Sequence, residues 1–317
     1  MSIRVVSPGV QTTVQDLGRF GFQQYGVPVA GAMDPRSLKL ANLLLDNEPG
    51  EAALEITIMG PQLVFDETNY ISLTGGDLSA VLDGKPLPRY QAVKVEAGQT
   101  LRFLGLRNGC RAYLAFAGGL DIPPVMGSRS TYMKAKIGGL NGRKLEAGDT
   151  LSFRAPKPDL DFPERRLIGI DFVPQKQYEL HVILGPQDDH FTEAGLRTFF
   201  REAYTVSADF DRMGCRLDGP IVEHKNGGDI ISDGIAFGAI QVPSAGKPII
   251  MAADRQTTGG YTKIATVCSA DFRFLGQLKG GDKVSFVPVT VEQAQNALTL
   301  EQQYFQMITD FFKRDRL

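Results

Sequence analysis

Short stretches of alternating apolar and polar residues, separated by glycine-containing turns, recur along most of the chain. They lie at Asn69–Leu73, Gln91–Val95, Thr100–Leu104, Ala112–Phe116, Tyr178–Leu184, Asp229–Ile231 and Lys283–Val287. A period of two residues is typical of strands that bury one face. The pattern therefore predicts a mainly β protein with many tight turns.

Helical periodicity is confined to a few places. One helix is expected after Asp34, which can cap it, with a proline in its first turn and an end by Asn47–Gly50. A second is expected from Asp188 to Tyr204. A third occupies the C-terminal stretch, where Thr290 and Gln293 have the spacing of a capping box. Its apolar stripe could bind a partner, but such stripes more often pack on their own domain.

Two phrases recur in the same order along the chain. IMGPQLVF at Ile58–Phe65 is similar to ILGPQDDHF at Ile183–Phe191, and AGDTLSF at Ala147–Phe153 is similar to GGDKVSFVP at Gly280–Pro288. The two offsets are close, at about 125 and 133 positions, which indicates a duplicated β unit. A proline-rich segment, Ala155–Pro163, lies between the copies. We therefore expect one barrel at 1–157, a related barrel at 158–289 and a C-terminal helix at 290–317.

Composition narrows the possible classes of protein. The 317 residues carry a formal net charge of -2, and no basic run predicts binding to nucleic acid or to an anionic membrane. No apolar run is long enough for a membrane span, and the N-terminus has no signal-peptide pattern. The chain has 3 cysteines without CxxC spacing, which is typical of a reducing compartment. A cytoplasmic location is the prediction.

Several catalytic and binding motifs are absent from the sequence. There is no GxxxxGK[ST] phosphate loop and no GxSxG nucleophile turn. His181, His190 and His224 lie far apart and lack the spacing of metal ligands, so a structural role is favoured for each and no metal site is predicted.

The densest polar and glycine-rich cluster lies in the expected second barrel. DRMGCRL begins at Asp211, SDG and GAIQVP follow between Ser232 and Pro243, and DRQTTGGY begins at Asp254. A strand that ends in such a loop can present amides, hydroxyls and a carboxylate to a small polar ligand. A glycine-rich hairpin with capped turns explains the same residues about equally well.

The chain resembles the biotin-dependent carboxyltransferase family, also called the allophanate-hydrolase subunit 2 family. The phrases that carry the resemblance include TTVQDLGRFGFQQYGVPVAGAMD, AGGLDIPPVMGSRST, SDGIAFGAIQVPSAGKPII and DRQTTGGYTKIATV. The resemblance covers about Val10 to Val289 and implies a pair of cyclophilin-like β-barrels with a few peripheral helices.

The resemblance also implies an activity. Free-standing chains of this family most often serve as the C subunit of an ATP-dependent 5-oxoprolinase, a cytoplasmic hydrolase complex that opens 5-oxo-L-proline to L-glutamate while ATP becomes ADP and phosphate. It implies two partners, a small B-like subunit (similar to the Kip-type kinase inhibitor) and a third, A-like subunit. ATP could bind at a partner or at an interface. Other members are biotin-dependent urea or allophanate carboxyltransferases, which need biotin, and non-catalytic antagonists of a sporulation-kinase inhibitor.

Side-chain chemistry and position within the family motifs indicate roles for individual residues. Asp254 is predicted as a general base or orienting carboxylate, Arg212 as a clamp for carboxylate or phosphate, and Lys263 as a countercharge. The predicted substrate contacts are Gln241, Pro243, Gln256, Thr257, Thr258, Gly259, Gly260 and Tyr261. Asp77 and Arg129 are weaker candidates in the first barrel. Each charged residue also has a structural explanation, such as a solvated ion pair or an ordinary strand position.

Overall fold

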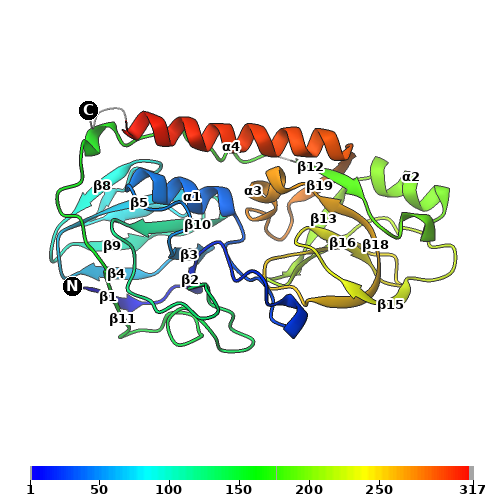
Figure 1. The fold of residues 1–317 in the computed structure, drawn as a ribbon, viewed down its shortest axis with the longest axis horizontal. Helices are drawn as coiled ribbons and strands as arrows, with labels where there is room; N and C mark the ends of the chain where they lie inside the picture. Colours follow the sequence, from blue (N-terminus) through cyan, green and yellow to red (C-terminus); the bar gives the residue numbers. More distant parts are fainter. Residues whose placement is uncertain (1, 176, 314–317) are drawn as a thin grey trace. The chain divides into compact units, whose positions relative to one another are not determined.

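The computed structural model describes residues 2–175 and 177–313, which divide into two compact units. The first unit combines the chain up to Arg19, Ala30–Pro174 and the chain from Phe305 onward. The second unit combines Phe20–Val29 with Gln175–Tyr304. Both are built mainly from strands, as the alternating pattern predicts (Figure 1).

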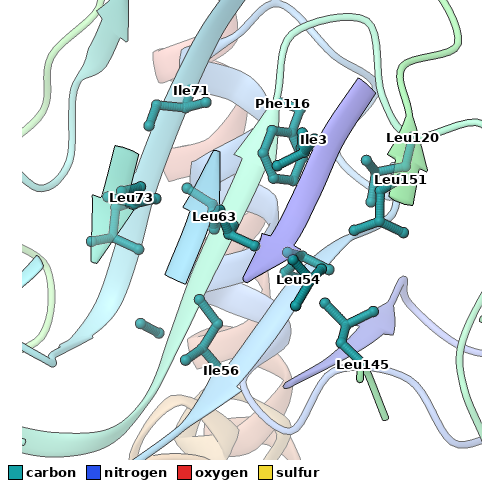
Figure 2. Packing of buried hydrophobic residues seen from close by; sticks show 14 of the residues in the cluster. Ile3, Leu54, Ile56, Leu63, Ile71, Leu73, Phe116, Leu120, Leu145 and Leu151 are labelled. Carbon is teal, nitrogen blue, oxygen red and sulfur yellow. The ribbon is translucent and has the colours of Figure 1, made fainter. Parts of the chain in front are cut away.

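The described part of the first unit contains two antiparallel sheets. The 6-stranded sheet has the order β11 (Thr150–Ser152), β1 (Ser2–Ser7), β4 (Gln62–Phe65), β9 (Thr100–Phe103), β6 (Ala80–Leu82) and β7 (Lys85–Pro86). The 5-stranded sheet has the order β2 (Gln11–Gln15), β3 (Ala53–Thr57), β10 (Asn108–Phe116), β5 (Asn69–Asp77) and β8 (Ala92–Val95). Their facing side chains form one apolar cluster, which includes Ile3, Leu54, Leu63 and Phe116 (Figure 2).

Helix α1 (Pro35–Leu44) covers the other face of the 5-stranded sheet. Its Leu38 and Ala41 are buried in a second apolar cluster with Tyr113 of β10. Asp34 caps the helix as expected, because its Oδ1 accepts a hydrogen bond of 3.0 Å from the backbone nitrogen of Ser37. A short 3-10 turn, η1 (Gln23–Tyr25), follows β2 in the chain but belongs to the second unit.

The second unit contains a closed barrel. Its strand order is β12 (Gln177–Leu184), β19 (Lys283–Pro288), β13 (Tyr204–Phe210), β14 (Gly214–Asp218), β17 (Ile249–Met251), β16 (Ala239–Val242), β18 (Thr258–Val267) and β15 (Asp229–Gly234). An additional β12–β18 pairing closes the ring and leaves β15 as an outer strand of a hairpin with β18. The β12–β19 pair is parallel, with Gln177 opposite Lys283.

The helix expected from Asp188 to Tyr204 is shorter in the structure. A 3-10 turn, η3 (Asp188–His190), is followed by extended Phe191, and α2 covers only Glu193–Arg201. Thr192 explains this start, since its hydroxyl accepts a hydrogen bond of 2.9 Å from the backbone nitrogen of Gly195. Near the end of β18 the chain forms η4 (Ser269–Asp271) and a short helix, α3 (Phe272–Leu275), which the sequence pattern did not predict.

Helix α4 (Val291–Lys313) begins at the predicted capping box. The backbone nitrogen of Thr290 donates to Oε1 of Gln293 at 2.8 Å, and the backbone nitrogen of Gln293 donates to Oγ1 of Thr290 at 3.2 Å. The last residues of the expected 290–317 helix, 314–317, lie outside the described residues. Among the described helices, including α4, none is both long and apolar enough to cross a membrane.

The limits of the two units differ from the expected barrels at 1–157 and 158–289. Residues up to Pro174 group with the first unit, and the turn η2 (Pro163–Arg165) lies in this segment. Backbone hydrogen bonds explain the grouping, since Ala92 donates to the carbonyl oxygen of Arg166 at 2.8 Å. Arg36 also binds Asp171 through two contacts of 2.7 Å. The proline-rich segment is therefore part of the first unit, although its composition resembles that of a linker.

Candidate functional site

A pocket of about 700 Å³ lies over strands β14, β17 and β16 of the second unit. The strand register places Arg216 opposite Ile249, and Ile249 opposite Gln241. These three residues form a row across the sheet, and all of them line the pocket. Because side chains alternate along a strand, their neighbours Cys215 and Ile250 face the other way and are buried.

The walls of the pocket come from two segments, each a loop together with the adjoining end of a strand. One is the end of β13 with its connection to β14: β13 contributes Asp209, and the connection contributes Asp211 and Met213. The other is the loop from β17 to β18, which contributes Gln256, with the first part of β18, which contributes Tyr261. The complete lining is Ala208, Asp209, Phe210, Asp211, Met213, Gly214, Arg216, Gln241, Pro243, Ile249, Met251, Gln256 and Tyr261. The pocket thus combines an apolar floor with a few polar groups, as sites for small molecules usually do.

Gln241 provides a buried hydrogen-bond donor. Its side chain is only 1% exposed, and its Nε2 has no hydrogen-bond partner among the described residues. This nitrogen lies over Gly259, where an added Cβ atom would come within 2.8 Å of it and within 2.6 Å of Cδ1 of Ile235. Gly259 therefore leaves the space that the amide occupies. A buried polar atom without a partner is unfavourable unless a ligand or water supplies one.

Arg216 is a second polar group with unused capacity. Within the described part of the chain, its exposed guanidinium forms no ion pair or hydrogen bond. Asp209 and Asp211 lie on the same pocket wall, and Oδ1 of Asp211 accepts hydrogen bonds from the backbone nitrogens of Met213, at 2.7 Å, and Gly214, at 3.1 Å. Arg216 is thus a pocket cation that can receive an anionic group.

Arg212 and Asp254, predicted as clamp and base, bind each other. Nε of Arg212 donates to Oδ2 of Asp254 at 3.0 Å, and Nη2 donates to Oδ1 at 2.9 Å. Both side chains are buried, with 5% and 7% exposure, and neither lines the pocket. The backbone nitrogen of Asp254 also donates to the carbonyl oxygen of Arg212 at 2.7 Å. The pair joins the two loops that form the pocket walls, which is a positioning arrangement.

The neighbouring Arg255 is also buried. Burial lowers the pKa of its guanidinium to about 10, against the opposing effect of Asp254, so the group stays protonated at neutral pH. Its Nε donates to the carbonyl oxygen of Ile235 at 3.0 Å, which attaches the β15–β18 hairpin to the loop.

Lys263, predicted as a countercharge, is already paired. Its Nζ lies 2.7 Å from Oδ2 of Asp233, and its side chain is 4% exposed, whereas Asp233 is half exposed. The hydrogen bond from Lys263 lowers the pKa of Asp233, with further help from the backbone nitrogen of Gly234. Lys263 lies opposite Gln241 in the β16–β18 pairing, but it does not line the pocket.

The predicted substrate contacts fall into two groups. Gln241, Pro243, Gln256 and Tyr261 come together in the pocket. Thr257, Thr258, Gly259 and Gly260 do not line it, because they form the turn and first residues of β18 and pair with β15. For example, the carbonyl oxygen of Thr257 accepts a hydrogen bond of 3.0 Å from Ile235. Gly259 contributes indirectly through the space it leaves for Gln241.

The weaker candidates of the first unit have structural contacts. Asp77 lies 3.9 Å from the guanidinium groups of Arg89 and Arg107 and accepts from the backbone nitrogen of Ser79 at 2.9 Å. Nε of Arg129 donates to the carbonyl oxygen of Ile122 at 2.8 Å. The described residues contain no cluster of three or more histidine, cysteine, aspartate or glutamate side chains that could hold a metal ion.

Sequence reasoning missed Arg216 and the apolar floor. The signal was present in the phrase DRMGCRL, where buried Cys215 and Leu217 flank Arg216 and so place it on the opposite face of the strand. The sequence does not reveal that this face lies next to Gln241, because β14, β17 and β16 are neighbours in the sheet but not consecutive in the chain.

Comparisons with known proteins agree with the sequence resemblance. Residues 25–288 match the family model described as "Carboxyltransferase domain, subdomain A and B". The chain is 37% identical to the 5-oxoprolinase C subunit of Escherichia coli (strain K12) over 310 residues, which are 96% of this chain and 97% of that protein. It is 34% identical to urea amidolyase of Saccharomyces cerevisiae over 93% of this chain and 17% of that protein.

Solved structures of related proteins are also similar to nearly the whole chain. The urea amidolyase of K. lactis has 32% sequence identity and a TM-score of 0.88, over 97% of this chain and 20% of that protein. Urea carboxylase of Kluyveromyces lactis gives a TM-score of 0.89 at 31% identity, over 97% of this chain and 29% of that protein. The family model, the curated relatives and the structures all match most of the chain, so it belongs to the carboxyltransferase family with subdomains A and B.

Proposed function

We propose that this chain is the C subunit of a heteromeric, ATP-dependent 5-oxoprolinase. The observation that carries the proposal is the end-to-end similarity to a protein named as the C subunit of 5-oxoprolinase, which extends over nearly the full length of both chains. A second relative of the same name, from Haemophilus influenzae (strain ATCC 51907 / DSM 11121 / KW20 / Rd), is 36% identical over 90% of each chain.

The pocket of the second unit has the chemistry that a lactam needs. An unstrained amide resists attack by water, so ring opening requires activation of its oxygen and donors placed where negative charge develops. The buried amide of Gln241 supplies a donor, and Gln256 and Tyr261 supply further polar contacts. Arg212 and Asp254 join the loop before β14 to the loop that carries Gln256. A direct catalytic role for Asp254 stays a prediction.

The proposed reaction uses one ATP and two water molecules. The lactam oxygen attacks the γ-phosphorus, and ADP leaves. Water then adds to the phosphorylated ring carbon, and the carbon–nitrogen bond breaks as the nitrogen takes up a proton. The second water hydrolyses the resulting acyl phosphate to L-glutamate and phosphate. Since the sequence contains no phosphate loop, we place ATP on one of the partners or at a surface shared with one.

The proposed function includes two partner subunits and a cytoplasmic location. The word "subunit" in the relatives' names supports assembly with further chains, and we propose one small B-like and one A-like partner. A cytoplasmic location stays a prediction from the cysteine content.

Reconstitution from purified subunits tests the proposal. This chain is mixed with its B-like and A-like partners, each omitted in turn, and glutamate release from 5-oxoproline is measured with and without ATP. We expect release only in the complete mixture. Gln256→Ala should lower kcat/KM for 5-oxoproline, because it removes an exposed pocket contact, whereas Gln303→Ala, which changes an exposed glutamine of α4, should not. Full activity without this chain would contradict the proposal.

Carboxyl transfer is the second candidate, because the urea amidolyase relatives match nearly the whole chain in sequence and structure. It needs biotin on a separate chain, where biotin would carry the carboxyl group. Gln241 and Gln256 could then hold the ureido oxygen, so the pocket residues fit that group as well. ATP-dependent carboxylation of urea by a mixture with a biotinylated carrier, together with no glutamate release from 5-oxoproline, would favour this function. A non-catalytic regulator would bind its partner and produce neither product.

A further inference from the structure

The pocket presents two polar groups at a fixed separation. Arg216 and Gln241 lie in one row across the sheet, on the strands that flank β17. Neighbouring strands are about 4.8 Å apart, so the Cα atoms of the two residues are separated by about 10 Å. Ile249 lies between them and provides an apolar surface for a small ring. The row therefore offers a cation and an amide donor on either side of an apolar floor.

We propose that Arg216 and Gln241 recognise the two ends of the substrate. The guanidinium of Arg216 binds the ring carboxylate, and Nε2 of Gln241 donates a hydrogen bond to the lactam oxygen. This inference rests on the proposed function and adds the substrate class, a small ring that carries a carboxylate and an amide carbonyl. Neither group has another partner within the described residues, and Nε2 of Gln241 is buried, so the ligand would satisfy it.

The acidic wall of the pocket supports a small monoanion rather than a nucleotide. Asp209 and Asp211 line the same pocket as Arg216. Their charges oppose a polyanion such as a nucleoside triphosphate, but a single carboxylate can bind at Arg216 with two parallel hydrogen bonds. The charge pattern thus agrees with a pocket for 5-oxoproline and with ATP binding elsewhere.

Gly259 has a positioning role in the same arrangement. An alanine Cβ at this position would approach Nε2 of Gln241 and Cδ1 of Ile235 closely enough to displace one of them. Gly234, on the partner strand of the hairpin, has no atom within 4 Å of an added Cβ. Gly259→Ala should therefore weaken binding at the amide end, and Gly234→Ala is its matched control.

Two half-substrates separate the two contacts. Cyclopentanecarboxylate has the carboxylate without the lactam, and 2-pyrrolidinone has the lactam without the carboxylate. Both are tested as inhibitors of glutamate release by the reconstituted complex. Arg216→Gln should raise the inhibition constant of cyclopentanecarboxylate about tenfold to hundredfold and leave that of 2-pyrrolidinone unchanged. Gln241→Met, and Gly259→Ala, should raise only that of 2-pyrrolidinone, about threefold to tenfold.

The experiment distinguishes a failure of this inference from a failure of the 5-oxoprolinase proposal. Arg201→Gln, which removes an exposed arginine of α2, should change neither constant. If Arg216→Gln and Gln241→Met affect both probes equally or neither probe, the inference is overturned while the 5-oxoprolinase proposal stands. If the complex releases no glutamate, that proposal fails, and saturation-transfer NMR of the two probes with the intact chain decides the inference. If Arg216→Gln weakens binding of cyclopentanecarboxylate alone and Gln241→Met weakens binding of 2-pyrrolidinone alone, the result supports a ligand of this class. If neither probe binds the intact chain, the inference is overturned.

Discussion

The ion pair between Arg212 and Asp254 illustrates how burial decides the role of a charged residue. Both groups are almost removed from water, and the opposite charge of each helps to compensate the charge of the other. Asp218 and Lys247 form a contact of similar length, 2.8 Å, but both side chains are 55% exposed. Water screens this second pair, and pairs of this kind contribute little to stability.

We expect Asp254→Asn to destabilise the protein by about 3 kcal/mol, because it leaves the buried guanidinium of Arg212 without its carboxylate. Chemical denaturation followed by circular dichroism measures the change. Asp218→Asn is the matched control and should cost less than about 1 kcal/mol. Equal losses in the two variants would show that burial does not distinguish these pairs. Activity of Asp254→Asn is informative only at temperatures where the variant stays folded.

His224 is a second residue whose surroundings affect its charge. Its Nε2 lies 3.1 Å from both the carbonyl oxygen of Val242 and Oγ1 of Thr262, and its ring packs against Phe191. Burial lowers the pKa of His224 below its usual 6.5, against the opposing hydrogen bond to Val242. The native state therefore favours the neutral imidazole.

This pKa shift predicts a loss of stability in mild acid. Well above pH 6.5 the imidazole is neutral in both the native and the unfolded state, so its pKa shift does not lower the free energy of unfolding. As the pH falls below 6.5, the unfolded chain takes up the proton before the native protein does, and the free energy of unfolding decreases. The fall in melting temperature between pH 7.5 and pH 5.5 should be smaller in His224→Gln than in the original protein. An identical fall in both proteins would contradict this expectation.

At the scale of single elements, capping explains where the helices begin. We expect Thr290→Ala to destabilise α4 by about 1 kcal/mol, since the variant loses the hydroxyl that accepts from Gln293. The melting temperature, together with hydrogen exchange of the first turn, reports the change. Thr299→Ala, in the middle of the same helix, should be neutral or slightly stabilising because alanine is the better helix former. A neutral Thr290→Ala would mean that packing alone fixes the start of α4.

Local signals in the sequence predicted the elements whose ends depend on local chemistry. The alternating stretches predicted β5, β8 and β19 closely, and the capping pairs predicted the starts of α1 and α4. The second helix was extended too far, because its periodic residues continue into Phe191 and Tyr204, which tertiary contacts place in other structures. Tyr204 belongs to β13 and packs against Phe286.

The candidate site was also predictable only in part, because some of its contacts depend on tertiary structure. Gln241, Gln256 and Tyr261 could be selected because they stand in unusual polar phrases. Two other features depend on which strands are neighbours in the sheet. One is the ion pair between Arg212 and Asp254, and the other is the position of Arg216 in the same pocket as Gln241. The order β14-β17-β16-β18 is set by the closed barrel and leaves no local signal in the sequence.

At the scale of the whole molecule, each compact unit is built from separate parts of the chain. The first unit needs residues on both sides of the second, and the second includes Phe20–Val29. We therefore expect that the fragments 1–157 and 158–317, expressed separately, do not unfold cooperatively in scanning calorimetry. The first fragment would lack the segment that carries Asp171, the partner of Arg36. A sharp, reversible transition in either fragment would contradict this prediction, and the intact chain provides the reference.

The parallel pairing of β12 with β19 has a consequence for biosynthesis. β12 is the first strand of the second unit to leave the ribosome, but the strand that pairs with Gln177 is made roughly 100 residues later. At usual rates of translation that delay is on the order of ten seconds. For most of this time neither edge of β12 has its native neighbour, because its other partner, β18, is also made late. The nascent chain therefore presents a transient site for chaperones or for mispairing with another nascent chain.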